Sequence, residues 1–244
     1  MQTATEKVNE IASIVSAIDW DAVKRDMDSQ GYAQVANVLP AEICEEFIRN
    51  YDQPSAYRKT VTMERHRFGL GEYKYFNYPL PDVVQTVRET VYPKLVPIAN
   101  NWMDQLGIER HFPETFEELR EECFENGQTK PTPLILKYGN GGFNTLHQDL
   151  YGEVYFPIQL AFFLNEPGKD YTGGEFVLTE QIPRAQSKAI VLTPNKGDMI
   201  IFTTNFRPVK GSRGFYREAM RHGVSEIRSG ERHTLGVIFH DAVS

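Results

Sequence analysis

The spacing of apolar and polar positions in this chain changes near residue 130. Before that point apolar residues recur three and four positions apart, the spacing that places them on one face of an α-helix. This pattern predicts one amphipathic helix over residues 3–29, with Gly31 as its stop signal. Three further helices are predicted, over residues 40–51, 81–106 and 114–126. We expect Pro93 and Pro97 to interrupt the second of these, because proline lacks the N–H that a helix interior needs.

From residue 131 onwards, short β-type runs alternate with turn residues. Eight candidate strands follow one another, in the runs PLILKY, NTLHQDL, YFPIQLAFFL, GEFVLTE, KAIVLT, DMIIFTT, FYREAMRHGVSEI and RHTLGVIFH. Their regular spacing is typical of a barrel or sandwich, and eight antiparallel strands are the number that a jelly roll needs. The predicted fold class is α+β but mainly β, a double-stranded β-helix with the N-terminal helices packed on one sheet. We expect one domain over residues 1–244, with residues 1–130 as helical support and residues 131–244 as the jelly-roll core.

Length and composition fit this prediction. A chain of 244 residues can bury one substantial core without disulfide bonds or structural metals. Its two cysteines, Cys44 and Cys123, are too few for a disulfide framework and lack metal-ligand spacing. No apolar run approaches the roughly 20 residues of a membrane span, and the first ten residues lack the pattern of a secretory signal. We therefore expect a cytoplasmic protein without a membrane partner.

The charge is distributed unevenly along the chain. Its net value of −7, from 26 Lys and Arg against 33 Asp and Glu, argues by itself against a nucleic-acid partner. Residues 57–78, however, hold five Arg or Lys against two Glu with six aromatic residues among them, and residues 205–221 hold five against one. Basic groups with stacking rings are what a flipped or single-stranded base needs, and the second stretch leads directly to His222, so its side chains could rim a site there. Solvated surfaces and aromatic core positions explain the same stretches equally well.

A candidate metal site begins at His147-Gln148-Asp149. Alternate residues of a strand point to the same face, so His147 and Asp149 project together. This pair alone is weak evidence, since a solvated Asp beside a hydrogen-bonded His has the same pattern. His222 follows 73 residues after Asp149, a separation that can return a jelly-roll chain to the neighbouring strand. Two histidines and one carboxylate form the facial triad of non-haem Fe(II) oxygenases, whereas zinc usually takes four ligands and neither cysteine is near.

The last predicted strand and the strand over PLILKY add polar groups to the same interior. Period two places Arg232 and Thr234 on one face, opposite the apolar residues that we expect to pack on the helices. A buried guanidinium needs an anion, which a dicarboxylate cosubstrate or a structural carboxylate would supply. Tyr138 shares a face with Leu134 and Leu136, so its phenol enters the barrel or belongs to the core. Two further histidines are interpreted as structural: His233 packs outward or pairs on the surface, and His240 takes part in a hydrogen bond.

These motifs together resemble a known superfamily, the Fe(II)- and 2-oxoglutarate-dependent dioxygenases. The motifs occur in the expected order, as Tyr138 with its glycine-rich turn, His147-x-Asp149, Gly173-Gly174-Glu175-Phe176, Gly197-Asp198, His222 and Arg232-x-Thr234. Residues 131–240 most resemble the prolyl-hydroxylase-like branch. Residues 20–242 are similar to a bacterial family of oxygenases acting on damaged, alkylated DNA, through stretches that include GEYKYFNYPLP, LHQDLYGE and RHGVSEIRSGERHTLGVIFHDA.

The resemblance implies an oxidoreductase with Fe(II) on His147, Asp149 and His222. The 2-oxoglutarate cosubstrate would meet Arg232 through its far carboxylate, with Thr234 and Tyr138 as helpers. O₂ and 2-oxoglutarate would be consumed, and a hydroxylated substrate, succinate and CO₂ released. The substrate is either alkylated nucleic acid, from which a hydroxylated N-methyl group leaves as formaldehyde, or a protein or peptide; a small metabolite is a further alternative. A non-catalytic metal-binding jelly-roll module is the alternative of another class.

Overall fold

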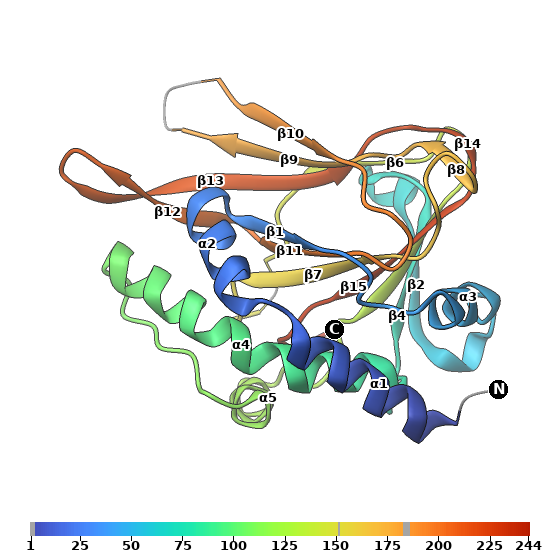
Figure 1. The fold of residues 1–244 in the computed structure, drawn as a ribbon, viewed down its shortest axis with the longest axis horizontal. Helices are drawn as coiled ribbons and strands as arrows, with labels where there is room; N and C mark the ends of the chain where they lie inside the picture. Colours follow the sequence, from blue (N-terminus) through green and yellow to red (C-terminus); the bar gives the residue numbers. More distant parts are fainter. Residues whose placement is uncertain (1–2, 151, 183–185) are drawn as a thin grey trace.

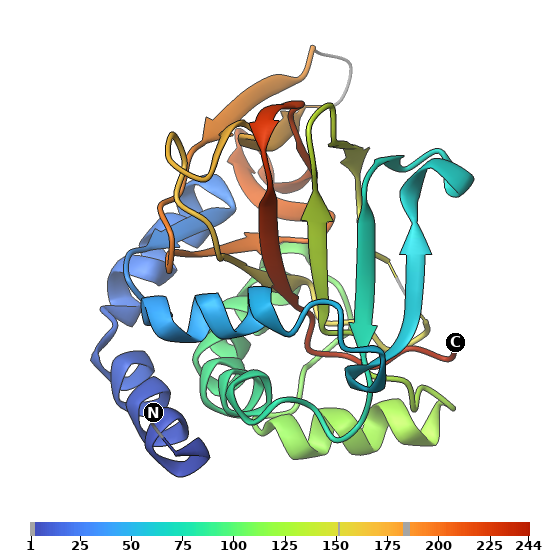
Figure 2. The ribbon, with the colours of Figure 1, turned by 90° about the vertical axis from the view of Figure 1, so that its right-hand side faces the viewer.

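Two facing antiparallel sheets form the centre of the molecule, and helices cover the outer side of one of them (Figure 1). The computed structural model describes residues 3–150, 152–182 and 186–244. The larger sheet has the order β1 (Tyr32–Val35), β11 (Met199–Thr203), β7 (Ile158–Phe163), β15 (Arg232–Val237), β5 (Leu134–Tyr138), β4 (Glu72–Phe76) and β2 (Tyr57–Thr62). Figure 2 shows β15, β5, β4 and β2 side by side.

The smaller sheet lies opposite the larger one. It has the order β10 (Lys188–Leu192), β9 (Phe176–Gln181), β13 (Gly214–Val224), β6 (Phe143–His147) and β3 (Gly69–Leu70), with β12 (Phe206–Gly211) paired to β13. A separate pair joins β8 (Tyr171–Gly173) to β14 (Ile227–Gly230). The mainly β prediction is confirmed, and each of the eight predicted runs contains a strand. The detail of eight strands is not confirmed, because residues after 130 also form β8, β12 and β14. The strands β1–β4 come from residues 1–130, which we expected to be helical support only.

The helices are α1 (Ala4–Ala17), α2 (Trp20–Gln30), α3 (Ala41–Arg49), α4 (Asp82–Leu106) and α5 (Phe116–Glu125), with short 3-10 helices η1 (Pro54–Ala56) and η2 (Met63–His66). The prediction of a single helix over residues 3–29 is wrong, since α1 ends at Ala17 and α2 begins at Trp20. Asp19 adopts a non-helical backbone there, and its carboxylate accepts a hydrogen bond from the Ala22 N–H at 2.9 Å. A local capping interaction thus divides one continuous apolar pattern into two helices.

The interruption predicted inside α4 is also wrong. Pro93 and Pro97 lie within one continuous helix, and both rings are exposed. The opposite face of α4 is buried, with Val91, Leu95 and Trp102 at 0 % exposure. Packing of that face against the larger sheet offsets the backbone hydrogen bonds that the prolines cannot donate.

Apolar side chains fill both sides of the larger sheet. Leu235, Val237 and Phe239 belong to the hydrophobic cluster shared with α1 and α4, as their alternation along the last strand predicts. A second cluster between the sheets includes Phe163 and Leu178. No helix among the described residues is long and apolar enough to cross a membrane.

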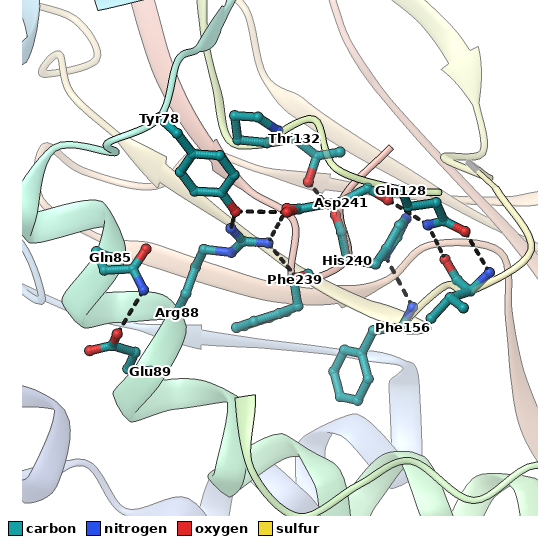
Figure 3. A network of polar contacts seen from close by, with 12 residues as sticks. Tyr78, Gln85, Arg88, Glu89, Gln128, Thr132, Phe156, Phe239, His240 and Asp241 are labelled. Carbon is teal, nitrogen blue, oxygen red and sulfur yellow. Dashed lines mark hydrogen bonds and ion pairs between the residues drawn. The ribbon is translucent and has the colours of Figure 1, made fainter. Parts of the chain in front are cut away.

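A buried polar network holds the chain after β15 (Figure 3). Arg88 of α4 is fully buried and pairs with the Asp241 carboxylate at 2.9 Å, and the Tyr78 hydroxyl donates to the other carboxylate oxygen at 2.7 Å. The His240 Nδ1 accepts from the Phe156 N–H at 3.1 Å, in agreement with a structural role. His233 is not among the residues that line the cavity with Arg232, but it is buried and not on the surface, because the Tyr51 ring lies against it with 5.3 Å between ring centroids. These contacts fix the carboxyl end of β15 against the helices.

Candidate metal centre

His147, Asp149 and His222 come together between the two sheets. His147 ends β6 and lies directly opposite His222 on β13, with 4.2 Å between the ring centroids. Asp149 follows β6 in a loop, and its two oxygens lie 3.5 Å from the His147 Nε2 and 3.3 Å from the His222 Nε2. One donor atom from each side chain fits within 4.8 Å of the others. The strand pairing thus brings His222 to the His147–Asp149 pair, although 73 positions separate His222 from Asp149 in the sequence.

The protonation states of this cluster suit a divalent cation. Burial, with the neighbouring His222, lowers the pKa of His147 and favours the neutral ring. The Nδ1 of that ring lies 2.7 Å from the Thr145 carbonyl oxygen. Because the carbonyl can only accept, the Nδ1 carries the proton and the Nε2 keeps its lone pair. Burial raises the pKa of Asp149, but His222, His147 and Gln159 outweigh it and hold that pKa below its usual range. Neutral imidazole and ionised carboxylate are the forms that bind metal.

A cavity of about 250 Å³ extends from this cluster towards β15. Tyr138, Arg232 and Thr234, the other polar residues predicted for the interior, all line it. Arg232 and Tyr138 are opposite each other in the β15–β5 pairing, and Thr234 is opposite Leu136. The three-residue cluster and a cationic group of the larger sheet therefore line the same cavity.

Arg232 has no carboxylate partner within the described part of the chain. Its side chain is 1 % exposed, and no ion pair among the described residues includes it. Its polar neighbour Tyr171 is a phenol whose pKa burial raises, so it stays protonated and does not neutralise the guanidinium. The guanidinium instead lies 5.1 Å from the Phe163 ring centroid and 5.7 Å from that of Tyr138. The Thr234 hydroxyl is likewise buried without a partner among these residues. Because a buried unpaired cation is costly, this end of the cavity suits an anion.

Two residues around Arg232 support its position. Burial raises the pKa of Tyr138 to about 12 against the opposing charge of Arg232, so the phenol stays protonated and can donate a hydrogen bond. Gly174 has a φ of +64°, and a Cβ there would lie 2.2 Å from the Ile227 Cδ1 and 3.1 Å from the Arg232 Cδ. A side chain at this position would therefore be strained by the positive φ and would press on Ile227, and less closely on Arg232.

Sequence reasoning missed several residues of the cavity. Gln159 on β7 contacts Asp149, and the only available signal was a single amide in the apolar run IQLAFF. Phe68, Tyr73 and Tyr75 line the cavity wall, although the aromatic residues of this stretch fitted core positions equally well. Phe76 is the one that is buried in the core.

The two basic stretches differ in their relation to the cavity. Among residues 205–221, which we expected could rim the site, none lines it, and the β12–β13 hairpin extends away from β6 (Figure 1). Arg207 is buried and pairs with Glu218 at 2.6 Å and Glu180 at 3.4 Å, which gives it a structural role. In the first stretch Arg58 donates to the Pro131 carbonyl at 2.9 Å. Arg65 and Arg67 of the same stretch are exposed.

Comparisons with known proteins identify related sequences. A family model described as "Oxygenase, catalysing oxidative methylation of damaged DNA" matches residues 71–242. Two uncharacterized proteins from Mycobacterium tuberculosis, of strains CDC 1551 / Oshkosh and ATCC 25618 / H37Rv, are each 49 % identical to this chain over 167 residues. The matched region covers 68 % of this chain and 72 % of each relative.

Solved structures with the same fold are more distant in sequence. A prolyl hydroxylase from Trichoplax adhaerens, in complex with a peptide fragment of the hypoxia inducible factor oxygen degradation domain, has a TM-score of 0.60 at 14 % identity, covering 98 % of this chain and 95 % of that one. A Pseudomonas putida prolyl-4-hydroxylase has a TM-score of 0.52 at 16 % identity, covering 91 % and 98 %. These likenesses show the fold.

Proposed function

This chain belongs to the Oxygenase-NA family and is a 2-oxoglutarate- and Fe(II)-dependent oxygenase, and from this premise we propose that it oxidises an alkylated base in nucleic acid. In this proposal His147, Asp149 and His222 hold Fe(II). Arg232, Thr234 and Tyr138 bind the far carboxylate of 2-oxoglutarate, which stretches along the cavity to them.

One observation carries the assignment of these roles. A cluster of two histidines and an ionised carboxylate shares its cavity with a buried cation that lacks a carboxylate partner among the described residues. A dicarboxylate with a chelating end satisfies both at once, since one end meets the metal and the other pairs with the Arg232 guanidinium. The donor set also favours iron over zinc, because no thiolate takes part and two histidines with one carboxylate leave open coordination positions.

The chain's own groups hold the reactants in place. Arg232 and Thr234 orient the far carboxylate, and the protonated Tyr138 phenol adds a donor beside them. Phe176 and Phe202 pack against the His222 ring and Phe163 packs on Phe176, so the His222 side of the cluster has an apolar wall. Bound Fe(II) with 2-oxoglutarate supplies the activation of O₂, with one oxygen atom ending in succinate and the other in the hydroxylated substrate, while CO₂ is released.

The substrate assignment rests on a segment at the cavity, residues 63–71, which we name the strap. It leaves β2 of the larger sheet, pairs with β6 of the smaller sheet through β3, and returns to β4. The Phe68 carbonyl accepts from the Thr145 N–H at 2.9 Å and from the Thr145 hydroxyl at 2.8 Å, which fixes the strap beside His147. The strap therefore borders the site from outside.

Its exposed side chains suit a nucleic acid. The rings of His66 and Phe68 are stacked, with 5.3 Å between centroids and 21° between planes, and Phe68 also lines the cavity. Arg65 and Arg67, which flank His66 in the sequence, are exposed and take part in no ion pair of the described residues. A base can stack on such rings while the guanidinium groups meet phosphates. An N-methyl group hydroxylated in the cavity would leave as formaldehyde, so the expected outcome is demethylation.

A peptide substrate is the second candidate, and one feature of the surface favours it. Leu70 and Phe143 face each other across the β3–β6 pair and are 37 % and 38 % exposed, next to Leu146 at 44 %. Apolar side chains of a peptide would bury this surface, and the Trichoplax adhaerens relative of the fold was solved with a peptide.

The test is succinate release measured with Fe(II), 2-oxoglutarate and one of three additions: N-methylated single-stranded oligonucleotides, unmethylated oligonucleotides of the same sequence, or proline-containing peptides. We expect N-methylated single-stranded oligonucleotides to stimulate succinate and formaldehyde formation, and unmethylated oligonucleotides of the same sequence to stimulate neither.

Substituting both Arg65→Gln and Arg67→Gln should raise the apparent KM for the oligonucleotide, with a weaker salt dependence, because phosphate contacts are lost. His147→Ala should abolish turnover. Stimulation by proline-containing peptides and not by any methylated oligonucleotide would replace the nucleic-acid assignment with the second candidate.

A further inference from the structure

One amide side chain of the larger sheet reaches the three-residue cluster. β7 is buried along its whole length, and Gln159 is the only polar residue in its sequence IQLAFF. Gln159 is 4 % exposed and lines the cavity. Burying an amide in a central strand costs free energy unless its hydrogen bonds are satisfied. The groups that Gln159 contacts therefore indicate what its amide does.

Gln159 holds one oxygen of Asp149. Its Nε2 donates to the Asp149 Oδ2 at 2.8 Å and lies 3.4 Å from the His222 Nε2. The carboxylate can only accept, so the NH₂ group must face Asp149 and the amide oxygen must face elsewhere. That oxygen is buried and has no partner among the described residues. The other carboxylate oxygen, Oδ1, is on the His147 side at 3.5 Å from the Nε2.

Asp149 is positioned differently from the two histidines. His147 and His222 are opposite each other on paired strands, and the Thr145 carbonyl fixes the His147 ring. Asp149 lies in the loop that follows β6, and Gln159 is one of the groups that contact its carboxylate. A carboxylate can bind a metal through one oxygen or through both, and the second mode occupies a further coordination position.

We propose that Gln159 is a positioning residue that keeps Asp149 bound to the metal through a single oxygen. By engaging Oδ2 it leaves Oδ1 as the ligand atom, so that three positions stay open for the two chelating oxygens of 2-oxoglutarate and for O₂. This inference rests on the proposed metal site, and it assigns to the larger sheet a direct part in setting the coordination number.

The test counts open positions on Mn(II), which substitutes for Fe(II) without reacting with O₂. Water-proton relaxation of the Mn(II)-loaded full chain reports the exchangeable waters on the metal, and calorimetry gives the affinities for Mn(II) and 2-oxoglutarate. Gln159→Met keeps the length of the side chain without its donor. Gln159→Asn keeps the amide but ends one methylene short of Asp149, and it guards against a folding defect in the first variant. Gln34→Leu is the matched control. Gln34 of β1 likewise donates from its amide to a carboxylate, the Asp198 Oδ2 at 3.0 Å, but neither residue lines the cavity.

We expect both Gln159 variants to lose about a third of the relaxation enhancement, as one of three waters is displaced by the second carboxylate oxygen. The dissociation constant for 2-oxoglutarate should rise at least about 10-fold, while that for Mn(II) changes by less than about threefold. Gln34→Leu should match the wild type in all three measurements. Wild-type relaxation and 2-oxoglutarate affinity in the Gln159 variants would overturn the inference, as would an equal loss of Mn(II) and 2-oxoglutarate binding. A wild-type chain that binds no Mn(II) would instead refute the proposed function.

Discussion

Arg232 is the residue whose environment is hardest to explain without a ligand. Its guanidinium is enclosed by aromatic rings, and no acidic side chain among the described residues neutralises it. Glu175 forms its hydrogen bond with Ser225 and its ion pair with Arg228, and no ion pair among the described residues joins it to Arg232. The Gly174 backbone lets the Arg232 side chain lie in this position. Each of these features keeps a cation available for an incoming anion, at a cost in stability that ligand binding offsets.

Replacing Arg232 should therefore weaken 2-oxoglutarate binding more than metal binding. For Arg232→Gln we expect the dissociation constant of 2-oxoglutarate on Mn(II)-loaded protein to rise about 10- to 100-fold, since a hydrogen bond between charged groups contributes roughly 1.5–3 kcal/mol. Calorimetry on the loaded protein measures this directly. Arg228→Gln is the control, because Arg228 is 69 % exposed and pairs with Glu175 at 3.3 Å. Unchanged 2-oxoglutarate affinity in Arg232→Gln would remove Arg232 from the binding site.

At the scale of elements, α4 and the segment after β15 depend on each other. Arg88 in the second turn of α4 binds Asp241 and the Phe239 carbonyl, and Tyr78 completes the network (Figure 3). The same helix buries an apolar face on the larger sheet despite two prolines. Since β15 carries Arg232 and Thr234, the contacts of α4 hold the strand that forms one end of the cavity.

Breaking the buried ion pair should destabilise the whole fold. Arg88→Met leaves Asp241 charged and buried, and we expect it to lower the free energy of unfolding by about 3–5 kcal/mol. The double substitution Arg88→Met with Asp241→Leu should recover part of that loss, because no charge then remains buried without its partner. Urea unfolding followed by circular dichroism measures both. Arg49→Met, at an exposed pair 3.9 Å from Glu45, should change stability by less than about 0.5 kcal/mol. Equal effects at the two sites would contradict this account.

At the scale of the molecule, the two sheets contribute different parts of the site. The smaller sheet carries His147 and His222, whereas the larger sheet carries Arg232, Thr234 and Gln159. A ligand that binds the cluster and Arg232 together therefore links the two sheets. The helices share one hydrophobic cluster with the larger sheet, while the division of residues 1–244 into domains stays a prediction.

Metal and 2-oxoglutarate should therefore stabilise the protein jointly. At concentrations about 100-fold above their dissociation constants, ligand linkage contributes about 2.7 kcal/mol, which for a chain of this size corresponds to a rise in Tm of roughly 5–10 °C. We expect thermal unfolding to show this rise with Mn(II) and 2-oxoglutarate together, its reversal by a chelator, and its absence in His222→Ala. The same rise from 2-oxoglutarate alone would show that it binds without the metal.

The positions of the elements were predictable from the sequence to a large extent, and the limits of that prediction lie at particular residues. All eight runs after residue 130 contain strands, because a buried strand requires a run of apolar or alternating side chains. Asp19 and Pro93 were misjudged in opposite directions. A capping carboxylate broke a helix that the apolar pattern continued, and the buried face of α4 maintained a helix that the prolines were expected to break.

The sequence by itself determined which side chains share a face, as with His147 and Asp149 or Arg232 and Thr234, because alternation is a local property of one strand. Only the tertiary structure decided which faces meet. It placed His222 opposite His147, brought Gln159 from another sheet to Asp149, set Phe68 of the strap at the cavity and buried Arg207 against two glutamates. These contacts join residues far apart in the chain, and their geometry follows from strand register and sheet packing, which no local pattern contains.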